Sequence, residues 1–199
     1  MRLFSLILIL YSLLASIHPA IADEHPKYTG PSCIGEFCFD VSSISMLITE
    51  SEFVNKYGKG QKESDKYIAY CYDVPDQKLY VRFRPYIEAK KYIIDVFVSD
   101  VTSCPSVYRS KIPFKPFVTK EGLKIGDPYK KAIYLYGKPN VEKKATGIEK
   151  MGMEYQKRST LAPFGDTVLI YGPEKRHPLH AHIYLRKGKV SAILISMSP

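Results

Sequence analysis

Two short segments that favour helix end in the same tripeptide, at residues 57–59 and 136–138. Apolar residues recur at helical spacing before each glycine, and we expect Gly58 and Gly137 to end the helices in the left-handed αL conformation. Runs of alternating apolar and polar residues follow each segment, with Gly, Pro and Asp between them, as is typical of antiparallel strands. This order favours an internal duplication, although any amphipathic helix ending in glycine would explain part of the likeness.

The starts of the two helices carry different signals. Thr49 and Glu52 have the spacing of a capping box, whereas Asp127 precedes Pro128 as an N-cap residue precedes a first helical proline. Strand-like runs follow at 67–72, 79–84, 92–99, 152–157, 167–171, 180–186 and 189–197. The predicted fold class is α+β: two similar units, each a short helix or helix pair packed on a three- to four-stranded antiparallel sheet.

The N-terminus has the pattern of a secretory signal. Arg2 precedes an apolar run from Leu3 to Ile17, and small residues lead to Ala22. We expect cleavage after Ala22 and a periplasmic or extracellular protein without a membrane-spanning segment; an uncleaved anchor is the alternative. The predicted organisation is a signal at 1–22, a first unit at 23–104, a Pro-rich linker at 105–118 and a second unit at 119–199.

Four cysteines, Cys33, Cys38, Cys71 and Cys104, lie in the predicted first unit. In an oxidising compartment an even number of cysteines indicates disulfides, and four cysteines allow three pairings. We favour Cys33 with Cys38 and Cys71 with Cys104. Their spacing does not fit the paired ligands of a zinc knuckle.

A family resemblance rests on residues 122–140, GLKIGDPYKKAIYLYGKPN, and on the strand-like runs that follow. This stretch resembles a motif shared by the small outer-membrane assembly lipoproteins and β-lactamase inhibitor protein, whose fold is a tandem of α+β units. In β-lactamase inhibitor protein the two sheets join and their open face grips another protein. The resemblance therefore implies a binding scaffold. It transfers no contact residue, and this chain lacks the lipidated cysteine of the lipoproteins.

The most chemically distinctive stretch is the histidine-rich run at 180–186. Alternation along a strand places His180, His182, Tyr184 and Arg186 on one face. A two-residue turn at Lys187-Gly188 would set His182 opposite Ile193, so we expect these five residues, His180, His182, Tyr184, Arg186 and Ile193, to form a binding face. The positive residues expected around it are Arg158, Lys175, Arg176, Arg186 and Lys189.

The formal net charge of +9 favours an acidic protein or an anionic envelope component as partner rather than nucleic acid, although solubility alone would explain it. The sequence has no nucleophile elbow, phosphate loop, dinucleotide fingerprint or His-Glu-x-x-His helix. Asp95 stands alone in an apolar run, where we expect an edge or outward position. We predict a non-enzymatic binding module without a cofactor, such as an inhibitor or an envelope-assembly accessory. The alternative is a metal-dependent or hydrolytic envelope enzyme, with His177, His180 and His182 as Zn²⁺ or Cu²⁺ ligands.

Overall fold

The computed structural model describes residues 28–39, 48–59, 61–64, 67–69, 77–85, 90–100, 110–145, 164–172 and 179–197. The predicted signal at 1–22, Cys71, Cys104 and His177 lie outside these ranges. The described elements are the helices α2 (Glu50–Tyr57) and α3 (Tyr129–Tyr136) and the strands β1 (Cys33–Ile34), β2 (Phe37–Cys38), β3 (Gln61–Ser64), β4 (Tyr67–Ala69), β5 (Lys78–Pro85), β6 (Lys91–Ser99), β7 (Val141–Lys144), β8 (Thr167–Tyr171), β9 (Leu179–Arg186) and β10 (Lys189–Met197).

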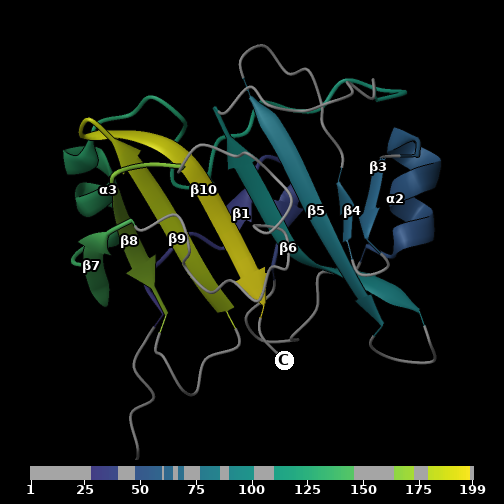
Figure 1. The fold of residues 1–199 in the computed structure, drawn as a ribbon, viewed down its shortest axis with the longest axis horizontal. Coiled ribbons are helices and arrows are strands. Elements are labelled where there is room, and N and C mark those ends of the chain that lie inside the picture. Colours follow the sequence, from purple (N-terminus) through teal and green to yellow (C-terminus); the bar gives the residue numbers. More distant parts are fainter. Residues whose placement is uncertain are drawn as a thin grey trace, which may run out of the picture.

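A single eight-stranded antiparallel sheet organises the described chain, in the order β3-β4-β5-β6-β10-β9-β8-β7 (Figure 1). Its two central strands, β6 and β10, come from distant parts of the sequence. They pair from Ala192 opposite Ser99 to Ser196 opposite Asp95. The sheet is therefore continuous across the middle of the molecule.

The prediction of two separate helix-on-sheet units is wrong. The described chain is mostly β, with two helices of eight residues each and one large sheet that both parts of the sequence build together. The physical reason is the apolar character of β6 and β10 on both faces. Residues from Val96 to Ser99 and from Val190 to Ile195 are all buried, so neither strand is suited to be a solvent-exposed sheet edge.

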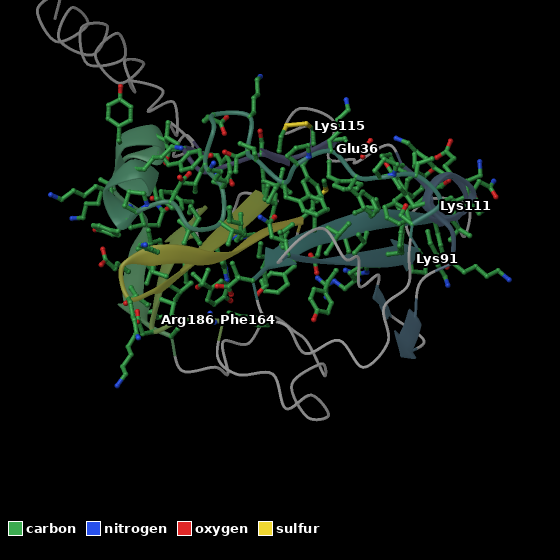
Figure 2. All side chains as sticks on the ribbon, turned by 90° about the horizontal axis from the view of Figure 1, so that it is seen from above. Glu36, Lys91, Lys111, Lys115, Phe164 and Arg186 are labelled. Atoms are coloured by element: carbon green, nitrogen blue, oxygen red, sulfur yellow. A yellow bond between two sulfur atoms is a disulfide. The ribbon has the colours of Figure 1, made fainter. Side chains whose placement is uncertain are left out.

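Both helices and the β1–β2 hairpin lie on one side of the sheet (Figure 2). In α2, Phe53 and Tyr57 are one turn apart and point into the core, where the ring of Phe53 lies 5.5 Å from that of Phe83 on β5. In α3, Ala132 and Tyr136 take the corresponding buried positions. Burying one such aromatic side chain contributes about 2–3 kcal/mol towards holding the helix on the sheet.

The helix ends agree only partly with the sequence. The predicted capping box of Thr49 and Glu52 is confirmed. The predicted N-cap at Asp127 is wrong, because Pro128 holds that position and Asp127 instead accepts hydrogen bonds from Lys124 N and Lys131 Nζ. Gly58 and Gly137 end the helices with φ of 94° and 74°, but their ψ values of 173° and −164° are extended rather than αL.

The hairpin carries the predicted disulfide between Cys33 and Cys38, which is confirmed. The described part of the predicted linker, residues 110–118, is packed against the rest of the fold. Phe117 is buried in the core, Phe114 stacks on Tyr57 at 4.4 Å, and Gly35 N donates to Val118 O at 2.9 Å. This segment therefore covers the helix side of the sheet.

Candidate functional site

The candidate site is the sheet face opposite α2, α3 and the hairpin, here called the free face. Paired residues on neighbouring strands share a face, so the strand registers define rows of side chains across the sheet. One row, the central row, crosses six strands and consists of Val141, Ile170, His182, Leu194, Phe97 and Tyr80. Five of these six side chains are apolar or aromatic. Such a row is unusual for an antiparallel sheet whose described helices lie on one side, since the other face is then commonly polar.

The structure places four of the five predicted site residues on the free face. His180, His182 and Arg186 are partly buried, and Tyr184 belongs to a cluster with Phe97, Val168, Ala192 and Leu194. Ile193, the fifth, is fully buried in the core on the helix side. The predicted position of Ile193 is therefore wrong.

A β-bulge in β10 explains this error. The predicted turn at Lys187-Gly188 is present, but the register shifts between Val190 and Ala192. Ser191 is the additional residue, so His182 lies opposite Leu194, and Ile193 lies opposite Ile183. One extra residue moves every later side chain of the strand to the other face.

Ser191 also fixes the residue that covers the aromatic cluster. Its hydroxyl donates to the backbone oxygen of Phe164 at 2.5 Å, and Arg186 Nη2 donates to the same oxygen at 3.2 Å. The ring of Phe164 then lies 4.5 Å from that of Phe97 and 5.6 Å from that of Tyr184. Figure 2 shows Phe164 and Arg186 on the side of the sheet away from the helices.

This packing corrects the role predicted for Tyr184. Tyr184 does not lie beneath a helix, but it is only 4% exposed and contacts Phe97 and Phe164 edge to face. It is a packing residue of the free face rather than an accessible anchor. Half-buried apolar positions that the structure describes on this face include Val141, Ile170 and Tyr80, besides Phe164 itself.

Arg186 is likewise engaged within the protein. Its guanidinium contacts both carboxylate oxygens of Asp100, at 3.1 Å and 3.0 Å. Arg186 therefore holds Phe164 and Asp100 together and is not the unpaired rim charge expected from the sequence. Of the other predicted rim residues, Lys189 is exposed, whereas Arg158, Lys175 and Arg176 lie outside the described residues.

A second ion pair crosses the seam between β5, β6 and β10. Asp95 is 4% exposed, forms an ion pair with Arg82 and accepts a hydrogen bond from Ser196 at 2.6 Å. Burial raises the pKa of Asp95, and Arg82 and Ser196 partly oppose that shift. The expected edge position of Asp95 is wrong, because β6 is a central strand; the side chain lies on the free face but is buried there. The signal that could have found the pair is the arginine at the matching register of the neighbouring strand.

His182 occupies the central row without a hydrogen-bond partner for its buried Nδ1 atom. Burial, with help from nearby His180 and Lys143, lowers the pKa of His182 to about 4. The imidazole is therefore neutral at neutral pH, and it lies between Ile170 and Leu194 in the row. In the described part of the chain, no group of three or more His, Cys, Asp or Glu side chains could hold a metal ion.

No protein-family model matches the chain, and neither a curated protein nor a solved structure matches it. Within the described ranges, no helix has the length and apolar character needed to cross a membrane.

Proposed function

We propose that this protein is a secreted or periplasmic, non-enzymatic binding module that binds an acidic protein through the free face of its sheet. The observation that carries the proposal is the central row. Its apolar side chains extend across six strands, and the half-buried Val141, Ile170 and Tyr80 lie on its outer strands. Apolar groups that remain accessible on the helix-free side of a sheet commonly mark a contact surface.

The polar groups of this face favour binding over catalysis. Asp95 and Asp100 are each engaged by an arginine, and a neutral His182 has no hydrogen bond at Nδ1 to orient it as a base. A histidine of this kind resembles an apolar ring more than a catalytic group. The proposal therefore assigns His182 to the contact surface, together with Ile170 beside it.

The charge of the chain points to an acidic partner. The chain carries a formal net charge of +9, and exposed Lys143 lies at the β7 end of the face, in register with Val168. Such a charge would increase the rate of encounter with an acidic protein and make it sensitive to salt. Binding through an open sheet face is also what the resemblance to β-lactamase inhibitor protein implies, and that relationship stays a prediction.

A matched pair of substitutions tests the proposal. Ile170→Asp places a charge in the central row, and Ile112→Asp makes the same change at a 40% exposed position of the 110–118 segment. A protein captured from envelope extract by the parent chain should bind Ile170→Asp at least about tenfold more weakly and Ile112→Asp equally well. Thermal melts should show that both variants are folded.

Hydrogen exchange locates the contact independently of these variants. Amide protons of β8 and β9 should become protected in the complex. Protection confined to α2 and α3, or equal affinity of the parent and Ile170→Asp, would rule out the free face as the binding surface.

A further inference from the structure

We propose that the outer surface of α3 binds an anionic lipid bilayer. This surface, here called the α3 ridge, consists of Lys130, Tyr134 and Lys138. Tyr134 is 87% exposed, far more than any other large apolar side chain that the structure describes. Lys130 precedes it by one helical turn and Lys138 follows the end of the helix, and both lysines are exposed.

The charge around the ridge is strongly positive. Residues 119–144 contain seven lysines and three acids. Each acid is engaged by a neighbour: Glu121 accepts from Tyr136 Oη at 2.8 Å, Asp127 pairs with Lys131 at 2.8 Å, and Glu142 accepts from Tyr129 Oη at 3.1 Å. Figure 2 shows nitrogen-tipped side chains extending from α3 at this end of the molecule.

The composition of the ridge fits a bilayer better than a protein partner. A stable protein contact needs an apolar centre that is removed from water, on a patch of about 800 Å² per partner. One tyrosine among lysines does not supply such a centre. A lipid interface needs no matching pocket, because the tyrosine ring lies at headgroup level and the lysine ammonium groups reach the phosphates.

The ridge is separate from the free face. Helix α3 packs on the opposite side of the sheet (Figure 2). Ala132 and Tyr136 are its buried residues, whereas Tyr134 is 87% exposed and therefore points away from the sheet. Lipid binding by the ridge would therefore leave the free face available, and the two proposals stand or fall independently.

Tryptophan fluorescence tests the site directly, because the chain contains no Trp. Tyr134→Trp provides a single reporter on the ridge, and Ile112→Trp provides a matched reporter on the 110–118 segment. With vesicles of phosphatidylcholine containing phosphatidylglycerol, the emission of Tyr134→Trp should shift to shorter wavelength and that of Ile112→Trp should not. Phosphatidylcholine alone should shift neither, and added salt should reverse the effect.

Charge variants in the Tyr134→Trp background separate local from overall charge. Lys130→Gln with Lys138→Gln should weaken vesicle partition about 25-fold, since each lysine near an anionic surface contributes about fivefold. Lys111→Gln with Lys115→Gln makes the same change in net charge on the 110–118 segment and should have little effect. The apolar N-terminal run is common to all these chains, so any vesicle binding that it contributes is the same for the two charge variants.

Three outcomes would overturn the proposal. They are an equal shift with uncharged vesicles, an equal loss of partition in the two charge variants, and a shift of Tyr134→Trp with polyglutamate but not with vesicles. The last result would assign the ridge to an acidic polypeptide instead.

Discussion

The hydroxyl of Ser191 donates to the backbone oxygen of Phe164 at 2.5 Å, which ties the bulge in β10 to the residue that covers Tyr184. The same bulge moves Ile193 to the helix side of the sheet. Ser191→Ala should lower the free energy of unfolding by about 1–2 kcal/mol, the usual effect of removing a buried hydrogen bond. Urea unfolding measures the change. A loss below about 0.3 kcal/mol would show that the backbone alone maintains the bulge.

Tyr184→Ala should destabilise the fold rather than remove an exposed contact. The side chain is 4% exposed and its ring contacts those of Phe97 and Phe164. Truncating a buried aromatic residue typically costs about 3–5 kcal/mol. Differential scanning calorimetry should show a much lower melting temperature, whereas Tyr134→Ala on the surface should melt like the parent. An unchanged melting temperature for Tyr184→Ala would contradict the packing described here.

Stability should fall on acidification through His182. The pKa of His182 is lowered from 6.5 to about 4 in the folded state, so between these values the unfolded chain binds more protons. The stability that depends on a neutral His182 is fully present above pH 6.5 and is lost as the pH falls towards 4, by about 3 kcal/mol in total.

Comparison with His182→Leu isolates this effect from the titration of Asp95 and other groups. The difference in unfolding free energy between the parent and His182→Leu should change between pH 7.5 and pH 4.5. At low pH the variant should become more stable relative to the parent. A constant difference would mean that His182 has an ordinary pKa.

The ion pair of Asp95 and Arg82 should behave as a unit. Arg82→Leu leaves the carboxyl of Asp95 buried without its cation, which should cost about 3–5 kcal/mol. The double variant Arg82→Leu with Asp95→Leu should recover much of that loss, because neither buried charge remains. Chemical denaturation of the two single variants and the double variant measures the coupling. Additive losses would mean that the two side chains contribute separately.

Gly137→Val should destabilise by about 1–3 kcal/mol through backbone strain alone. Gly137 combines a φ of 74° with an extended ψ, and a Cβ placed there would have no neighbour within 4 Å. Gly137→Ala should cost nearly as much, because the strain comes from the Cβ itself. Thermal melts compare the two variants. A neutral Gly137→Val would show that the backbone at this position adapts easily.

The local features of the fold could be predicted from the sequence. Thr49 and Glu52 cap α2 as predicted, Gly58 and Gly137 end the helices, Lys187-Gly188 makes the turn, and Cys33 pairs with Cys38. Each of these features depends on residues within a few positions of one another. The alternation of His180, His182, Tyr184 and Arg186 onto one face was predictable for the same reason.

Only the tertiary structure decided what those local pieces form. The sequence did not show that β6 and β10 pair, which makes one sheet instead of two, because that contact joins residues about a hundred positions apart. Nor did it show that Ser191 forms a bulge and bonds to Phe164. The ring of Phe164 then covers Tyr184, and the bulge moves Ile193 to the other face of the sheet. The hydrogen bond from Ser196 to Asp95, which joins residues 101 positions apart, was hidden for the same reason. The two-residue alternation along a strand determines which face a side chain occupies only where no bulge interrupts the strand. Its exposure depends on the distant segments that pack against it.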